Sequence, residues 1–155
     1  MTPAIWFIDT SVLTNLLPVP GRDQDSTAVR DLLQHHTDRG DRFILPITSV
    51  IETGNFVAQI PDGHVRRSTA ERFEHLLRLV ADGKSPWIFH DVPWNAQFLQ
   101  RLLDGAGTEI SYLNHAIAEV GMGDLCILTE RDHYRRRTGV RAKIWTLDHG
   151  LAAHG

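Results

Sequence analysis

The chain has 155 residues, about the size of one average domain, and this is long enough to bury a core without disulfides. Hydrophobic residues make up 42% and charged residues 23%, which argues against wholesale disorder. Sixteen Lys and Arg against nineteen Asp and Glu give a net charge of −3, so any nucleic-acid site must be local. The single cysteine, Cys126, excludes an intrachain disulfide and fits a cytoplasmic location.

We expect neither a membrane-spanning segment nor a signal peptide. No apolar run approaches the roughly twenty residues that a spanning helix needs. The apolar N-terminal stretch has no Lys or Arg ahead of it, and Asp9 interrupts it. The sequence shows no repeat and only one short linker-like stretch, at residues 18–25, so residues 1–155 are predicted to form a single domain.

Short apolar runs alternate along the chain with segments of helical spacing. The first run, residues 4–8, is apolar throughout and ends at Asp9, as expected of a strand buried on both faces. In chain order the pattern predicts strand 4–8, helix 11–17, helix 26–39, strand 42–45, helix 49–60, helix 68–81, strand 86–90, helix 94–103, an additional helix at about 108–120, helix 124–137, strand 142–147 and a helical tail at 150–154.

This alternation of strands and helices indicates the α/β class. We therefore predict a three-layer α/β/α sandwich around a short, mainly parallel sheet.

Four acidic residues occupy similar places at the ends of these elements. Asp9 ends the first strand and Asp148 ends the last one. Glu52 is expected in the first turn of helix 49–60, and Asp124 is expected to open helix 124–137 after two glycines. Ligands in open parallel sheets gather beyond the carboxyl ends of the strands, so these acids are predicted to meet at one edge.

Clustered carboxylates repel each other unless cations accompany them, and hard oxygen ligands select Mg²⁺ or Mn²⁺. Two such ions can promote attack of water on a phosphodiester. Capping is the alternative role, because Asp and Glu favour helix N-termini. Ser49 and Glu52 have the spacing of a capping box, Asp124 suits an N-cap, and Asp9 could cap the following helix.

Four segments, FIDTSVL, PITSVIETGN, GDLCILTERD and IWTLDHG, occur in the order of the four acidic motifs of the PIN-domain ribonucleases. The chain resembles this family, which includes the toxins of type II toxin–antitoxin pairs, over nearly its whole length. The first and last motifs, an apolar strand followed by Asp-Thr-Ser or by Thr-x-Asp, are the most specific.

The resemblance implies a PIN-like α/β/α fold and an endoribonuclease that hydrolyses RNA with Mg²⁺ or Mn²⁺. It also implies a cytoplasmic enzyme, a homodimer and a cognate antitoxin as partner. The additional helix at about 108–120 departs from a compact toxin of this type. The matching positions are the metal ligands Asp9, Glu52 and Asp124, the more variable acid Asp148, and the neighbouring hydroxyls of Thr10, Ser11 and Thr146.

Other catalytic patterns are weak in this sequence. The nine histidines are scattered and form no metal-ligand motif, and Cys126 lies among apolar residues, as a core cysteine does. The glycines before Asp124 lack the Lys-Ser/Thr of a phosphate-binding loop. A phosphotransferase of the haloacid-dehalogenase type needs a second Asp where Ser11 stands.

The segment from Arg131 to Lys143 holds the one dense basic tract. It is either a solvated helix end that complements the helix dipole or a strip that contacts RNA phosphates, with Arg131 and Arg135 as the candidate contacts. A catalytically inert binding module that kept the PIN fold is the alternative to the ribonuclease.

Overall fold

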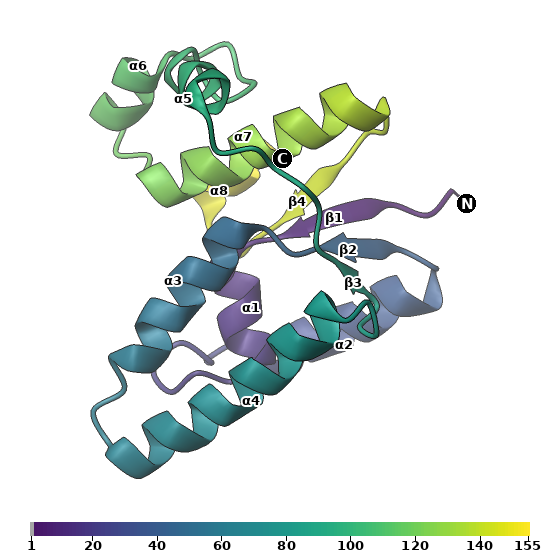
Figure 1. Cartoon of the computed structure of the whole chain (residues 1–155), viewed down its shortest axis with the longest axis vertical. Helices are drawn as coiled ribbons and strands as arrows, with labels where there is room; N and C mark the ends of the chain where they lie inside the picture. Colours follow the sequence, from purple (N-terminus) through teal and green to yellow (C-terminus); the bar gives the residue numbers. More distant parts are fainter. Residues whose placement is uncertain (1) are drawn as a thin grey trace.

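Helices and short strands alternate along residues 2–155, which the computed structural model describes (Figure 1). The strands and helices of this part of the chain are β1 (Ile5–Ile8), α1 (Thr10–Leu16), α2 (Ser26–Asp38), β2 (Arg42–Ile44), α3 (Ile47–Ala58), α4 (Gly63–Ala81), β3 (Trp87–Ile88), α5 (Ala96–Leu103), α6 (Tyr112–Ile117), α7 (Met122–Thr138), β4 (Lys143–Trp145) and α8 (His149–Ala152).

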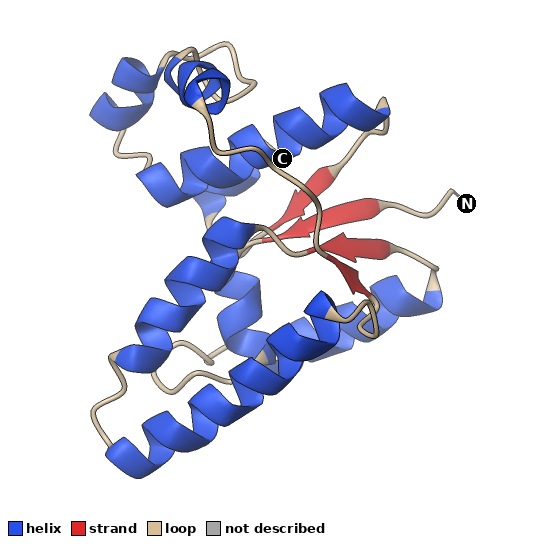
Figure 2. Ribbon diagram, in the orientation of Figure 1, coloured by secondary structure: helices blue, strands red, loops and turns tan. Residues whose placement is uncertain are grey.

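The four strands form one parallel sheet in the order β3-β2-β1-β4. Phe7 of the central strand β1 pairs with Ile44 of β2 on one side and with Ile144 of β4 on the other. Helices cover both faces of this sheet (Figure 2), so the predicted α/β/α sandwich is confirmed, and its sheet is parallel throughout.

Alternate side chains of β1 enter two separate hydrophobic clusters. Phe7 packs with residues of α5 and α7, and Ile5 lies against the same cluster. Ile8 packs with residues of α1, α2 and α4, and Trp6 lies against that cluster. This period of two, with apolar side chains on both faces, is what a strand covered by helices on each side requires.

The order of the strands creates a crevice beside β1. The chain moves from β1 to β2 and β3, and then returns past β1 to place β4 on its other side. Open parallel sheets bind ligands at such a reversal, beyond the carboxyl ends of the strands. Asp9 directly follows β1, and Asp148 follows β4 after two residues, so both acids lie at this crevice.

Several helices begin earlier than their apolar pattern predicts, α3 and α4 among them. The helix predicted from residue 49 begins at Ile47, directly after Pro46, whose extended backbone precedes the first turn. The helix predicted from residue 68 begins at Gly63, because the Asp62 carboxylate accepts a hydrogen bond from the Val65 N–H and caps it. Its first turns are exposed and polar, so they leave no apolar period in the sequence.

The additional helix predicted at about 108–120 is present but shorter, since α6 spans only Tyr112–Ile117. The Ser111 hydroxyl caps it by accepting a hydrogen bond from the Asn114 N–H. Glu119, with a φ of 64°, turns the chain away just after the helix ends.

Within residues 2–155, no helix combines the length and the apolar character that crossing a bilayer requires.

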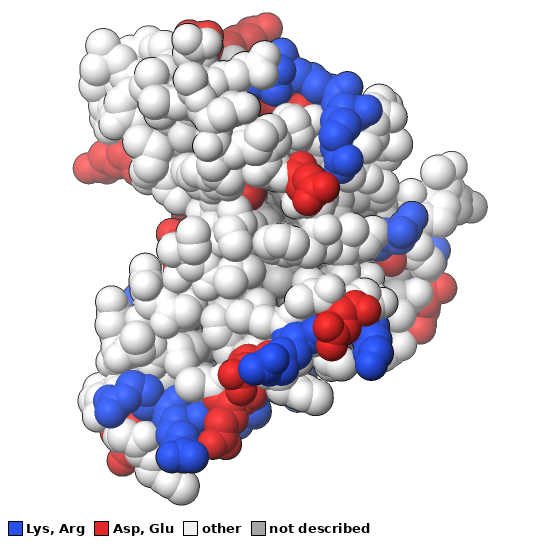
Figure 3. All heavy atoms as spheres, viewed as in Figure 1, with Lys and Arg blue, Asp and Glu red and all other residues white. Residues whose placement is uncertain are grey.

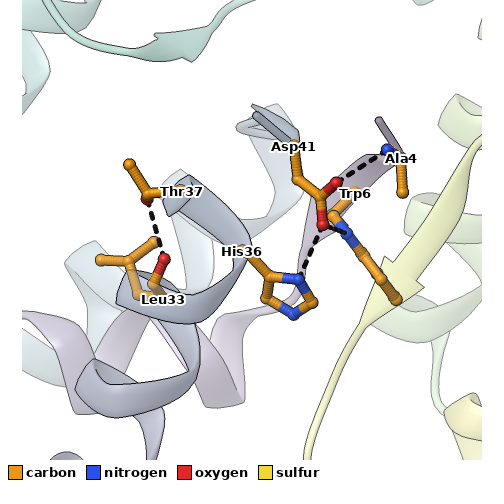
Figure 4. Close-up of polar contacts among 6 residues, drawn as sticks. All are labelled: Ala4, Trp6, Leu33, His36, Thr37 and Asp41. Carbon is orange, nitrogen blue, oxygen red and sulfur yellow. Dashed lines mark hydrogen bonds and ion pairs between the residues drawn. The ribbon is translucent and has the colours of Figure 1, made fainter. Parts of the chain in front are cut away.

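A buried polar network joins the start of β1 to the end of α2 (Figure 4). It lies at the amino ends of the strands, whereas the acids lie at their carboxyl ends. The Asp41 carboxylate accepts hydrogen bonds from the Ala4 N–H, at 2.8 Å, and from the Trp6 indole N–H, at 3.1 Å. The Nδ1 atom of His36 lies 2.8 Å from the same carboxylate. Burial acts to raise the pKa of Asp41, but these hydrogen bonds outweigh it and hold that pKa below its usual range.

Replacing the hub of this network, Asp41→Asn, is expected to lower the free energy of unfolding by about 1–3 kcal/mol at neutral pH, because the amide brings two donors to a site that already holds donors. Denaturant titration measures the change. Asp38→Asn, an exposed acid on α2, is the matched control and should stay within about 0.5 kcal/mol of the unmodified protein. Equal stability of the two variants would contradict a role for this network in tying β1 to α2.

Candidate functional site

One cleft at the carboxyl end of the sheet is lined by all four predicted acids, Asp9, Glu52, Asp124 and Asp148. They come from the end of β1, from α3, from the first turn of α7 and from the segment after β4. The sequence prediction that these acids meet at one edge is therefore confirmed. The far wall of the cleft comes from α1 and from residues 21–25, which precede α2.

Asp9 is the most buried of the four acids, with only 4% of its surface exposed. Its Oδ2 atom accepts hydrogen bonds from the hydroxyls of Ser11 and Thr146, each at 2.7 Å. The Ser11 N–H, 3.4 Å from Oδ2, adds a weak N-cap contact at the start of α1. Oδ2 therefore caps α1, which is the capping role considered for Asp9, and the residue also lines the cleft.

The two hydroxyls that hold Asp9 also fix the segment after β4. The Ser11 Oγ accepts a hydrogen bond from the Leu147 N–H, and the Thr146 Oγ1 accepts one from the Asp148 N–H. Asp148 in turn caps α8, accepting from the N–H groups of the two residues that follow His149. The positions of Asp9 and Asp148 are therefore coupled through Ser11 and Thr146, two of the predicted hydroxyl residues.

Glu52 is tied to α1 by the third predicted hydroxyl residue, since the Thr10 Oγ1 donates to its Oε1 at 2.7 Å. Glu52 lies in the second turn of α3, and the prediction of a first-turn position is wrong because the helix begins at Ile47. The predicted capping box is wrong for the same reason. Ser49 is inside the helix, and its hydroxyl donates to the carbonyl of Ile8 at the end of β1.

The carboxylate of Glu52 lies directly against Gly123, so closely that a Cβ at Gly123 would overlap it. Gly123 precedes Asp124 in the first turn of α7. Absence of a side chain at this position therefore leaves room for the Glu52 carboxylate beside the first turn of α7.

Asp124 is the third residue of α7, which begins at Met122 after Gly121, so it is not the N-cap that the alternative interpretation required. Burial is the first cause that raises its pKa, to about 7, and the charges of Asp9, Asp148 and Glu52 raise it further. Without added cations, a cluster of this kind does not hold all its negative charges at neutral pH.

The four carboxylates share a cleft but do not form a ready-made metal cage. Among residues 2–155, no three His, Cys, Asp or Glu side chains converge closely enough to hold a metal ion together. The oxygen donors and the raised pKa of Asp124 nevertheless fit a hard cation that stays largely hydrated. Mg²⁺ keeps several waters and commonly binds through only one or two carboxylates, so a dry cage is not required.

The predicted RNA contacts of the basic tract are not supported by the geometry. Arg131 is only 4% exposed, and its guanidinium donates to the carbonyls of His154 and Gly155. Arg135 donates through two nitrogens to the carbonyl of Ala142, just before β4. Both arginines tie the C-terminal part of the chain to α7, so several of their N–H donors already have partners within the protein.

The exposed cations of this tract lie over the far end of α7 (Figure 3). Arg135 follows Asp124 by eleven residues, which is about 16 Å along a helix. Arg136 also pairs with Asp132, at 2.9 Å, and Lys143 lies over the ring of Trp6. Four cations of the tract thus have contacts within the protein, and contact of the tract with RNA stays a prediction.

Cys126 is buried in the core on α7, as its sequence context predicts. Burial is the main cause that raises the pKa of its thiol to about 11. A thiol with such a pKa is not a nucleophile at neutral pH.

Sequence reasoning missed several residues at the cleft, and two of them, Arg22 and Phe56, contact each other. Arg22 lies in the stretch 18–25 that had only the character of a linker, and Phe56 follows Glu52 by one helical turn. The guanidinium carbon of Arg22 is 3.4 Å from the centre of the Phe56 ring. The one available signal was the spacing of Glu52 and Phe56, which puts both side chains on one face of a helix.

No family model, curated protein or solved structure matches this chain.

A further buried acid, Glu130 on α7, lies beside the start of α3 and does not line the cleft. Its surface is fully buried, and its carboxyl lies near the N–H groups at the start of α3 without forming a well-aligned hydrogen bond to them. Burial raises its pKa to about 8, although N–H groups of Ile47 and Thr48 at the start of α3 act to lower it. That start has no side-chain cap of its own, so Glu130 lies where the helix end favours an acceptor.

Glu130 should therefore make stability fall as pH rises. Between pH 4.5 and about 8 the unfolded chain has lost this proton while the folded protein keeps it, so the folded state binds more protons. The free energy of unfolding should drop by up to about 1.4 kcal/mol per pH unit in this window and level off above it. Denaturant titrations of the unmodified protein and of Glu130→Gln, run at several pH values, measure the difference in slope. Identical slopes would contradict the assignment.

A methyl group at Gly123 should displace Glu52 and break its hydrogen bond to Thr10. Alanine at an open helix position exceeds glycine in stability by about 0.5–1 kcal/mol. Gly54→Ala on α3, where the methyl would only contact the Phe73 ring at 3.7 Å, is the matched control and should show this gain. We expect Gly123→Ala to be less stable than Gly54→Ala by about 1 kcal/mol or more. If denaturant titration finds both variants stabilised equally, the Glu52–Gly123 packing is not tight.

Proposed function

We propose that this protein is a metal-dependent endoribonuclease of the PIN type. The observation that carries the proposal is the convergence of four carboxylates from distant parts of the sequence on one cleft. Burial and the other three acids together raise the pKa of Asp124 to about 7, which means that the cluster favours the binding of cations. Mg²⁺ or Mn²⁺ is the ion that such oxygen donors select.

Asp9, Glu52, Asp124 and Asp148 are the residues that would hold the ions. A divalent ion in this cleft would supply Lewis acidity and would neutralise charge on a phosphodiester during attack by water. The chain itself supplies orientation. Asp9 is fixed by two hydroxyls at Oδ2, and Glu52 is fixed at Oε1 by Thr10, so each carboxylate offers its other oxygen in a defined direction.

RNA as substrate and an antitoxin as partner follow from the family resemblance. Exposed apolar side chains on α5 and α6, among them Leu99, Leu103, Leu113 and Ile117, offer a surface for a protein partner. We propose that this apolar surface binds a protein partner, either a second copy of the chain or an antitoxin.

A catalytically inert binding module is the second candidate. It is favoured by the absence, within residues 2–155, of three acids already converged on one point. In such a module the acids would serve mainly as helix caps, as Asp9 and Asp148 do here.

Asp9→Asn should abolish cleavage of single-stranded RNA in the presence of Mn²⁺ while the protein stays folded. Asparagine caps helices as well as aspartate does, and its Oδ1 can still accept from Ser11 and Thr146. The loss of one anionic ligand weakens the binding of the ion. Rates of RNA cleavage measure the effect, and we expect a loss of at least about a hundredfold.

The control is Asp82→Asn, an exposed acid at the end of α4, which should cleave like the unmodified protein. Thermal unfolding with and without Mn²⁺ separates the two candidates independently of activity. The ribonuclease should melt at higher temperature with Mn²⁺, and Asp9→Asn should lose this increase. Full activity of Asp9→Asn, or no response of the unmodified protein to Mn²⁺, would favour the inert module.

A further inference from the structure

The segment between α1 and α2, residues 18–25, forms the outer wall of the acidic cleft and is firmly anchored. Val19 is 1% exposed and packs in the core, and its N–H donates to the carbonyl of Thr14. The Asn15 side chain accepts a hydrogen bond from the Asp25 N–H, at 2.9 Å, and donates to the carbonyl of Ser11. Both ends of the segment are therefore fixed to α1, the helix that carries Thr10 and Ser11.

Within this wall the guanidinium of Arg22 lies over an aromatic ring. Its central carbon is 3.4 Å from the centre of the Phe56 ring, and Phe56 belongs to α3, one turn after Glu52. The Arg22 N–H donates to the carbonyl of Val19, so its backbone is held as well. Stacking on an aromatic ring fixes the plane of a guanidinium while its N–H donors remain available at the edge.

Arg22 is also free of acidic partners. The four ion pairs within residues 2–155 involve other side chains. The hydrogen bonds that guanidinium groups donate in this part of the chain come from other arginines. Among the residues that line the acidic cleft, Arg22 is the single Lys or Arg. Arg22 is exposed and lines the acidic cleft, yet it forms none of the ion pairs found within residues 2–155.

A polyanion approaching the cleft meets the charges of four carboxylates and of Asp25 on the same wall. Arg131 and Arg135 of the α7 tract donate to backbone carbonyls and do not line the cleft. Cations held by the acids can neutralise only the phosphate at the reaction centre. A flanking phosphate needs a positive charge further out along the wall, and Arg22 is the one there.

We propose that Arg22, stacked on Phe56, binds a backbone phosphate of the RNA next to the one that is cleaved. A guanidinium whose plane is already fixed presents two parallel N–H donors to phosphate oxygens at a small entropic cost. Arg22 is thus a positioning residue, which holds the strand across the cleft without taking part in bond cleavage. This inference rests on the proposed ribonuclease activity and identifies how that site holds its substrate.

The test measures binding of a single-stranded RNA dodecamer at several salt concentrations, with Asp9→Asn as the parent protein so that the strand is not cut. Adding Arg22→Gln should weaken binding and reduce the slope of log K against log salt by about 0.7, the value for one lost phosphate contact. Arg39→Gln, an exposed arginine at the end of α2, is the matched control and should leave the slope unchanged.

Phe56→Leu separates a stacked, oriented guanidinium from a simple charge. It keeps the charge of Arg22 and the apolar cover, so the salt slope should stay the same while affinity falls about threefold or more. In the cleaving protein, Arg22→Gln should raise KM by about three- to tenfold and leave kcat within about twofold, because a phosphate contact positions the strand.

Each result bears on the two proposals separately. If the unmodified protein cleaves RNA but Arg22→Gln matches Arg39→Gln in both slope and KM, the role of Arg22 is overturned and the ribonuclease stands. If RNA binds with an Arg22-dependent slope but is not cleaved, the phosphate contact stands and the ribonuclease falls. If the dodecamer does not bind at all, both are overturned.

Discussion

Burial of the Asp9 carboxylate at the end of the central strand is the constraint on which the rest of the site depends. A carboxylate removed from water is stable only where donors replace the lost hydration. Here the donors are the hydroxyls of Ser11 on α1 and Thr146 after β4. Because the same hydroxyls accept N–H groups from the segment that leads to Asp148, the hydrogen bonds that stabilise Asp9 also assemble the neighbouring wall of the cleft.

The fold tolerates concentrated negative charge by placing acids where backbone donors are unpaired. Asp124 lies in the first turn of α7, which has no side-chain cap, and the helix end favours an anion there. Burial, and after it the charges of three neighbouring acids, oppose this and raise its pKa to about 7. Glu130 shows the same conflict at the start of α3, where burial prevails and the carboxyl stays protonated at neutral pH. The two carboxyl groups differ in their access to solvent, because Asp124 lines an open cleft and Glu130 is fully buried.

Positive charge serves two separate purposes in this protein. Arg131 and Arg135 donate hydrogen bonds to backbone carbonyls, and they hold the C-terminal residues and the start of β4 against α7. Arg22 makes no such bond and lies on the ring of Phe56 at the cleft. Arg131 and Arg135 of the dense basic run therefore make contacts within the fold, whereas Arg22, an isolated arginine in a short loop, lies beside the acids. Charge density along a chain does not report which guanidinium groups are already paired.

The sequence by itself determined the α/β class, the four strands and the meeting of the acids at one edge, because these follow from local apolar runs and from the rule that parallel strands end together. It predicted Asp9 and Asp148 best, since each follows a strand directly or nearly so. Only the tertiary structure decided the rest. Thr10 donates to Glu52, Glu52 packs on Gly123, and Arg131 donates to the carbonyl of His154. Each of these contacts joins residues that lie far apart in the chain. No local pattern encodes such contacts, because their energy depends on the distance between helices that the packing of the whole core sets.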